Sequence, residues 1–152
     1  MKRNILLLAT FLMLACPLFF TNCSNDPEMD AVPPSFKEVA INPKSAHAGE
    51  SVTATLKIQS MGKSWYKLNC AWTLINYSTD PVYSFKGEGY SLEMKEPVFN
   101  ISIPDDAPAG KYTLRINKLT VEAASLFPSG SLYGSPSIEN GSATLTVQEA
   151  EE

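Results

Sequence analysis

The 152-residue sequence predicts an all-β fold, an antiparallel β-sandwich of seven or eight short strands. Apolar and polar residues alternate with period two over most of the chain after Phe36, which is typical of strands with one buried face. Turn signals recur at intervals of about eight to twelve residues. The prolines after Cys23 fall in a linker, in turns or at strand ends, where a missing backbone donor does not interrupt a sheet.

Each expected strand has a row of apolar side chains between polar neighbours. The clearest case is 52–58, where Val, Ala, Leu and Ile alternate with Thr and Lys. In the next strand, Tyr66, Leu68, Cys70, Trp72 and Leu74 form the expected inward row. Residues 120–126 are the one stretch expected to have room for a helical turn. The expected strands are 36–41, 52–58, 66–74, 82–86, 90–94, 98–103, 112–116 and 143–147.

The N-terminal segment 1–22 is predicted to be a signal peptide. It begins with Lys2-Arg3, and residues 5–20 are then apolar apart from short interruptions. A membrane-spanning helix needs about 20 continuous apolar residues, so a retained membrane anchor is the less favoured alternative.

The residues around Cys23 resemble a bacterial lipoprotein signal. Lys2-Arg3, the apolar core and 20–23 (Phe-Thr-Asn-Cys) are similar to a signal peptidase II site, which implies cleavage before Cys23 and lipid on its sulfur. The acidic residues within 26–30 resemble those of Bacteroidetes-type surface lipoproteins, which implies an outer-membrane protein at the cell-surface leaflet. Cys16 is the alternative lipid site, but cleavage there leaves an apolar stub on the mature chain.

These features divide the chain into a signal peptide (1–22), a lipidated flexible tether (23–35), a sandwich domain (36–148) and an acidic tail (149–152). The formal net charge is −4, and loss of Lys2 and Arg3 with the leader makes it about −6. An acidic chain argues against a nucleic-acid partner. It also argues against attachment to the membrane through anionic headgroups, so the expected membrane contact is through the lipid on Cys23. With Cys16 removed and Cys23 lipidated, no intrachain disulfide is expected.

The sandwich region resembles bacterial immunoglobulin-like domains. The resemblance lies in 48–54, similar to the turn into a second strand, in Trp72, placed like a core tryptophan, and in 104–114, similar to the corner before the sixth strand. It covers most of 36–147 and implies that the Tyr112 hydroxyl bonds to the preceding loop. It implies a fold and almost nothing about function.

The sequence offers no recognisable catalytic, metal or cofactor site. His47 is the only histidine, and its turn lacks the ligand clusters of zinc sites. Cys70 is expected to be buried between Leu68 and Trp72 and therefore unreactive. The pair 105–106 (Asp-Asp) suits a corner turn better than a calcium loop. The sequence thus predicts a chain that is not an enzyme and needs no cofactor.

The connection 119–141 is longer than a hairpin needs, and long loops with aromatic residues are often functional. In an immunoglobulin-like sandwich it lies at the same end as the loop before the third strand. The two loops together supply the candidate binding surface: Met61, Trp65, Tyr66, Phe127, Leu132 and Tyr133. Phe127 and Leu132 have an alternative role as a small core beneath the loop. Trp65 and Tyr133 are the residues most expected to be exposed.

The expected function is that of a cell-envelope binding or accessory module. Its expected ligand is a glycan, taken up with an outer-membrane nutrient-import complex of the starch-utilisation type. The alternative is a protein-interaction or adhesion module, which would need a broader apolar patch.

Overall fold

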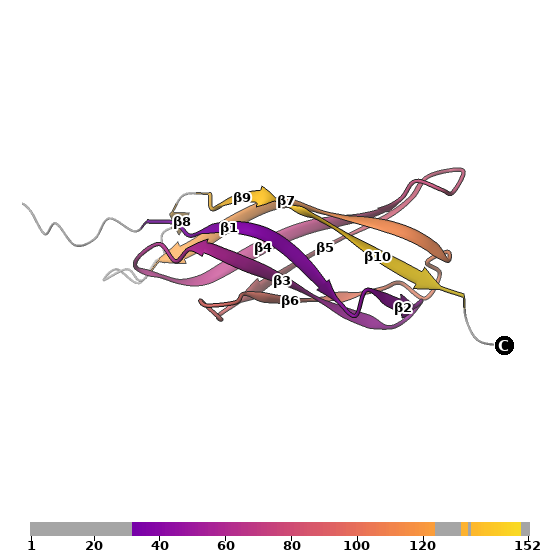
Figure 1. Ribbon diagram of the computed structural model, residues 1–152, viewed down its shortest axis with the longest axis horizontal. Coiled ribbons are helices and arrows are strands. Elements are labelled where there is room, and N and C mark those ends of the chain that lie inside the picture. The colour runs from indigo at the N-terminus through magenta and orange to yellow at the C-terminus, as the bar shows by residue number, and fades with distance from the viewer. Residues whose placement is uncertain (1–31, 124–131, 134, 150–152) are drawn as a thin grey trace, which may run out of the picture. The chain divides into compact units, whose positions relative to one another are not determined.

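The computed structural model describes residues 32–123, 132–133 and 135–149 (Figure 1). In this part of the chain no helix has the length and apolar character needed to cross a membrane. The predicted signal peptide, most of the tether and Cys23 lie outside the described residues. The strands are β1 (Ser35–Asn42), β2 (Ser45–His47), β3 (Ser51–Ser60), β4 (Trp65–Asn76), β5 (Tyr83–Ser91), β6 (Val98–Ser102), β7 (Gly110–Ala123), β8 (Leu132–Tyr133), β9 (Ser137–Asn140) and β10 (Ser142–Gln148).

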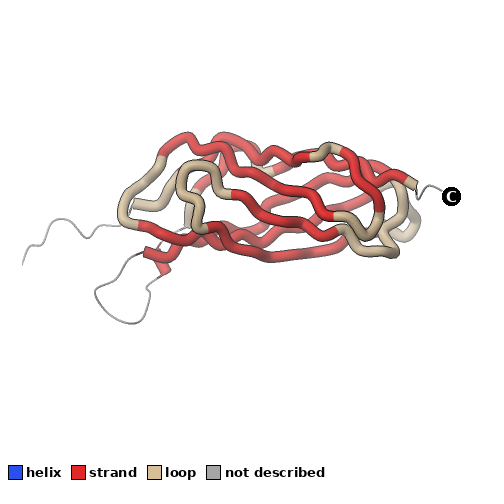
Figure 2. The backbone as a smooth tube through the Cα atoms, turned by 90° about the horizontal axis from the view of Figure 1, so that it is seen from below, coloured by secondary structure: helices blue, strands red, loops and turns tan. Residues whose placement is uncertain are grey.

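The strands form two sheets, so the all-β prediction is confirmed. One sheet has the order β6-β3-β1-β9 and the other β2-β10-β7-β4-β5, with β8 paired to β7. Most neighbours are antiparallel, but β1 pairs with β9 and β10 pairs with β2 in parallel. Pro43 separates β1 from β2, and the chain changes sheets there because proline cannot continue the ladder. The strands run along the length of the sandwich and the loops gather at its ends (Figure 2).

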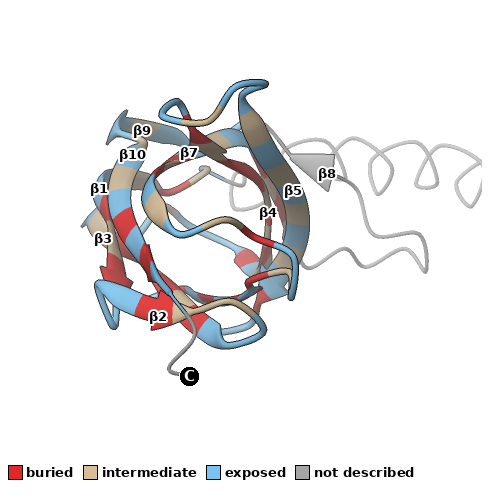
Figure 3. Ribbon diagram, turned by 90° about the vertical axis from the view of Figure 1, so that its right-hand side faces the viewer, coloured by how far each residue is buried: buried red, intermediate tan, exposed pale blue. Residues whose placement is uncertain are grey.

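The core lies between the sheets, and the buried residues, red in Figure 3, recur along the strands of both. Trp72 is 5% exposed and its ring centroid lies 6.2 Å from that of Phe99 in the opposite sheet. The prediction that Trp72 is a core residue is confirmed. The other large side chains that are fully buried are Tyr112, Phe36, Leu56, Leu68, Leu74, Ile101, Leu114 and Leu145.

The corner before β7 also agrees with the sequence. Tyr112 is fully buried, and its hydroxyl donates a hydrogen bond to the backbone oxygen of Pro108 at 2.8 Å. Burial raises the pKa of the Tyr112 hydroxyl, so the hydroxyl remains a donor at neutral pH. This bond ties the end of the loop to the core.

Two irregularities change which side chains of β4 and β7 face outward. Trp65 pairs with Ala123 while Lys67 pairs with Glu122, which leaves Tyr66 as an extra residue in β4. In the same ladder, Trp72 pairs with Ile116 and Ala71 with Lys118, which leaves Asn117 as an extra residue in β7. Each extra residue makes a β-bulge and shifts the alternation of its strand by one position.

The bulge at Asn117 explains the first of two errors in the predicted strands. Beyond Asn117, strand β7 continues to Ala123 with Leu119 and Val121 buried, so the connection does not begin at residue 119 and 120–123 is not helical. Residues 132–133 and 137–140 within that connection form β8 and β9. Strand β5 is also one strand, where two were predicted around Gly87 and Gly89.

Candidate ligand-binding groove

The structure does not assemble the predicted aromatic surface. Trp65 is only 3% exposed and its indole Nε1 donates a hydrogen bond to the backbone oxygen of Met61. The prediction that Trp65 is exposed is therefore wrong, because the bulge at Tyr66 turns Trp65 into the core. Met61 is 40% and Tyr66 42% exposed, as expected of the candidate surface, but the prediction that Tyr66 begins the inward row of its strand is wrong, since the bulge leaves it facing outward.

The other half of the predicted surface is described only in part. Phe127 lies outside the described residues. For Leu132 and Tyr133 the backbone alone is described, and they pair with Glu122 and Val121 at the end of β7.

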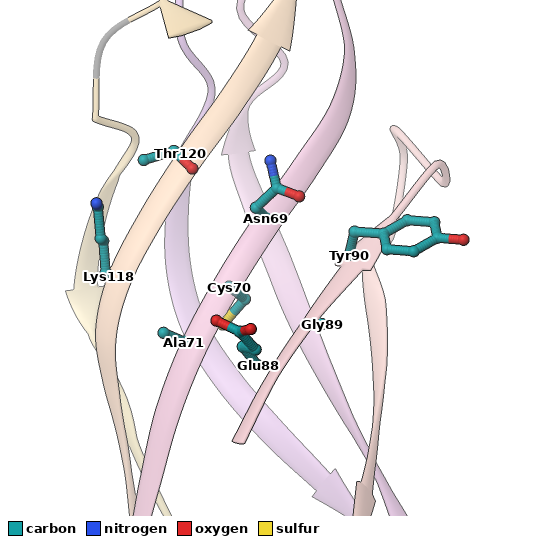
Figure 4. Close-up of a pocket in the computed structure, with 8 residues that line it drawn as sticks. All are labelled: Asn69, Cys70, Ala71, Glu88, Gly89, Tyr90, Lys118 and Thr120. Atoms are coloured by element: carbon teal, nitrogen blue, oxygen red, sulfur yellow. The ribbon is translucent and has the colours of Figure 1, made fainter. Parts of the chain in front are cut away.

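A groove lies on the outer face of the sheet formed by β5, β4 and β7, in a place the sequence did not indicate (Figure 4). Its volume is about 530 Å³, within the range of small-molecule sites. A second hollow of about 350 Å³ continues it along the strands and shares Ala71 and Glu88 with it. The side chains on the outer face around the first hollow are Asn69, Ala71, Glu88, Tyr90, Lys118 and Thr120.

Strand register explains why the face is hollow here. Asn69 lies between Tyr90 of β5 and Thr120 of β7, and the next outward residue, Ala71, lies between Glu88 and Lys118. The Ala71 side chain is short, whereas those of Glu88 and Lys118 on either side are long. Ala71 therefore forms the base of the groove, and Glu88 and Lys118 form its sides. In Figure 4 Lys118 and Tyr90 lie on opposite sides, and the Glu88 carboxylate extends from β5 toward β4.

The third row carries the second hollow. Thr73 lies between Lys86 of β5 and Arg115 of β7. Its hydroxyl accepts a hydrogen bond from the side-chain amide of Asn117 at 2.7 Å, which fixes the bulge residue against the sheet. Side chains two residues apart along a strand are separated by about 6.6 Å, so the three rows span about 13 Å.

A hydrogen-bonded cluster orders one end of the groove. The carboxylate of Glu122 accepts hydrogen bonds from Lys67 Nζ at 2.8 Å, Asn69 Nδ2 at 3.0 Å and Tyr66 Oη at 3.1 Å. Lys67 Nζ also lies 4.9 Å from the centre of the Tyr90 ring, a cation–π contact. Tyr90 itself is 62% exposed. The cluster therefore presents the Tyr90 ring to solvent in a defined position at the β5 side of the groove, where Figure 4 shows it pointing away from Asn69.

The charges within this cluster stabilise each other. The hydrogen bond from Lys67, followed by that from Asn69, lowers the pKa of the Glu122 carboxyl. The same hydrogen bond raises the pKa of the Lys67 ammonium. Both groups are therefore charged at neutral pH, and their pair keeps Lys67 over the Tyr90 ring.

Cys70 and His47, the two residues that the sequence analysis considered for chemical reactivity, do not present reactive groups to the groove. The Cys70 thiol is 2% exposed and unpaired, and burial raises its pKa to about 12, so it stays protonated as a core residue. His47 lies in β2, and its Nδ1 is 2.8 Å from the backbone oxygen of Glu149. Among the described residues no three His, Cys, Asp or Glu side chains are grouped so that they could hold a metal ion.

Comparisons with known proteins show no family for this chain. No protein-family model and no curated protein sequence matches it. Among solved structures, it is similar to the alkylpurine DNA glycosylase AlkC of Pseudomonas fluorescens bound to DNA with an abasic-site analogue, at 14% identity and TM-score 0.39 over 77% of this chain and 31% of that chain. It is also similar to the sporulation control protein Spo0M of Bacillus subtilis, at 14% identity and TM-score 0.32 over 80% of this chain and 50% of that chain. The chain thus spans half or less of either structure.

The first of these structures corrects two predictions from the sequence. The sequence predicted no enzymatic activity and no nucleic-acid partner, whereas this match is to an enzyme bound to DNA. Neither prediction is kept. At this level of similarity the match assigns neither an activity nor a DNA ligand to this chain.

Proposed function

We propose that this chain is a lipid-anchored binding module of the cell envelope, and that it binds a glycan in the groove on the outer face of β5, β4 and β7. The observation that carries the proposal is the ring of Tyr90, which is 62% exposed and is held by Lys67 beside the groove.

The chemistry of the groove suits a sugar. A sugar ring has an apolar C–H face that packs on an aromatic ring and a rim of hydroxyls that need hydrogen-bonding partners. Tyr90 supplies the ring, and Asn69, Thr120 and Glu88 supply an amide, a hydroxyl and a carboxylate along the adjoining rows. An aromatic platform next to several directional polar groups is what a ligand with these two kinds of surface requires.

The test is binding of the purified full chain to an array of neutral and acidic oligosaccharides, followed by titration calorimetry of those retained. Tyr90→Ala should weaken binding about tenfold, since an aromatic contact contributes about 1 kcal/mol or more. Val98→Ala is the control, because Val98 is an exposed apolar residue of β6 in the other sheet and does not line the groove. If no oligosaccharide is retained, or if both variants bind equally, the proposal is wrong.

The lipid anchor rests on the sequence around Cys23 and has its own test. In a bacterial host that processes lipoproteins, the chain should enter the membrane fraction, and its intact mass should show cleavage before Cys23 and added acyl chains. Cys23→Ala should leave the protein uncleaved and without lipid, whereas Cys16→Ala should not change either property. The reverse result would make Cys16 the lipid site.

A further inference from the structure

The groove face is more basic than the rest of this acidic chain. The formal net charge of the chain is −4. In the rows of β5, β4 and β7 that run from Lys67 to Thr73, four cations face outward against two carboxylates, which gives a local net charge of +2. The cations are Lys67, Lys86, Arg115 and Lys118, and the carboxylates are Glu88 and Glu122.

The excess charge lies in the groove and not in the cluster beside it. Lys67 and Glu122 form an ion pair at 2.8 Å and cancel each other. In the part of the chain that the structure describes, Lys86 and Lys118 form no ion pair, although each lines one of the two hollows. Arg115 follows in the last row, beside Thr73. Cations along a concave surface focus a positive potential on whatever occupies it.

We infer that the glycan bound in this groove is anionic, a chain of sugars that carry carboxylate or sulfate groups. This inference rests on the proposed glycan-binding function and names the class of ligand. A sugar ring on Tyr90 places the following rings along the strands, where Lys118 and then Lys86 meet their acidic groups. A neutral glycan over the same rows would remove water from these ammonium groups without supplying an opposite charge, which costs affinity.

Glu88 favours a glycan over another polyanion. Its carboxylate extends from β5 toward β4 (Figure 4), in the row that Ala71 and Lys118 share, and Lys86 lies two residues before it on β5. A carboxylate accepts hydrogen bonds from hydroxyl groups and repels phosphates. Glu88 repels the charged groups of either polymer, but each ring of an acidic glycan also carries hydroxyls that can donate to this carboxylate, whereas the phosphates of a nucleic acid only accept hydrogen bonds.

The test compares two pairs of glycans, each with a charged and an uncharged member, and adds one nucleic acid. The full chain is titrated with oligogalacturonate and its methyl ester, with dextran sulfate and dextran, and with a single-stranded oligonucleotide. We expect the charged member of a pair to bind at least tenfold more tightly at low salt, and the difference to shrink at high salt as screening increases. Lys118→Gln should weaken that binding about fivefold, and Lys86→Gln with Lys118→Gln more than tenfold.

Lys37→Gln is the matched control, because Lys37 is an exposed lysine of β1 in the other sheet. It should leave affinity unchanged. Equal affinity for the charged and uncharged members of every pair would overturn the inference but leave glycan binding standing. The same holds if the double lysine variant has the melting temperature of the parent protein and binds the charged glycans with the same affinity. Binding of no glycan would overturn the proposed function as well. Tighter binding of the oligonucleotide than of any glycan would replace the ligand class with nucleic acid.

Discussion

Replacement of Gly87 by alanine should destabilise the sandwich, while the same change at Gly89 should not. Both glycines are on the inward side of β5, beneath the indole of Trp72. A Cβ added at Gly87 would lie 2.7 Å from Cε2 and Cζ2 and 2.8 Å from Nε1 of that ring, whereas a Cβ at Gly89 would lie 3.2 Å from Cη2. The ring has little room to move because it is 5% exposed and packs near Phe99.

The expected cost follows from these contacts. Overpacking a rigid core costs about 1–3 kcal/mol, and replacing glycine in a strand returns up to about 1 kcal/mol. Gly87→Ala should therefore lower the free energy of unfolding by about 1–2 kcal/mol, equivalent to a fall in Tm of roughly 5 °C. Gly89→Ala should stay within about 0.5 kcal/mol of the parent protein, since a contact of 3.2 Å needs a shift of only a few tenths of an ångström.

Urea unfolding followed by far-UV circular dichroism measures both values. A double-mutant cycle with Trp72→Phe isolates the contact, because the smaller ring should recover most of the cost at Gly87 and none at Gly89. The reasoning is refuted if Gly87→Ala is as stable as Gly89→Ala, or if its cost is the same with phenylalanine at position 72.

Three further predictions concern single groups. Tyr112→Phe should lower the free energy of unfolding by about 1 kcal/mol in urea melts, because the buried hydroxyl that donates to Pro108 is lost; an unchanged value would contradict this. The Cys70 thiol, with a pKa raised to about 12, should react with a thiol reagent at pH 8 only as fast as the protein unfolds, and immediate labelling would show that it is exposed. Lys67 lowers the pKa of Glu122, so the contribution of this carboxylate to stability is present above its usual pKa of 4.5 and is lost as the pH falls through the lower folded pKa. Glu122→Gln should therefore flatten this part of a plot of Tm against pH. Parallel plots for the variant and the parent protein would contradict the prediction.

The regular strands were predictable because one buried face leaves a direct mark on the sequence. In β3, Val52, Ala54 and Leu56 are buried and the residues between them are not, as the alternation requires. In β6, Phe99 and Ile101 behave in the same way. Burial of alternate side chains is a property of each strand alone, so it can be read without knowing the neighbouring strands.

The errors arise where a strand changes phase. The inward residues of β7 have even numbers up to Ile116 and odd numbers from Leu119 onward, so period-two counting ends the strand at the bulge. The same reasoning misplaced Trp65, which lies on the far side of the bulge at Tyr66. Gly87 and Gly89 looked like a break in β5, but they are glycines because Trp72 leaves no space for a Cβ at Gly87 and little at Gly89.

The groove was missed for a different reason. Its residues are the outward positions of three strands, which look like ordinary solvated side chains in any one of them. They become a site only when the register sets Tyr90 beside Asn69 and places Ala71 between Glu88 and Lys118. Within 67–73 Ala71 is the one small apolar residue between polar outward neighbours, and only the residues paired with it across the sheet show that it forms the base of a groove.

The bulge at Asn117 also determines where this chain can change length. Removing Asn117 would restore regular alternation between Ile116 and Lys118, and every remaining side chain of β7 would keep its present side of the sheet. Removing one residue from the middle of 118–123 would instead reverse the sides of the residues beyond it, which exchanges parts of the groove wall with parts of the core. Loss of Asn117 would therefore keep Lys118 and Thr120 on the groove side, although the hydrogen bond to Thr73 in the second hollow would be lost, whereas a deletion a few residues further along would disrupt the groove and the core beyond it.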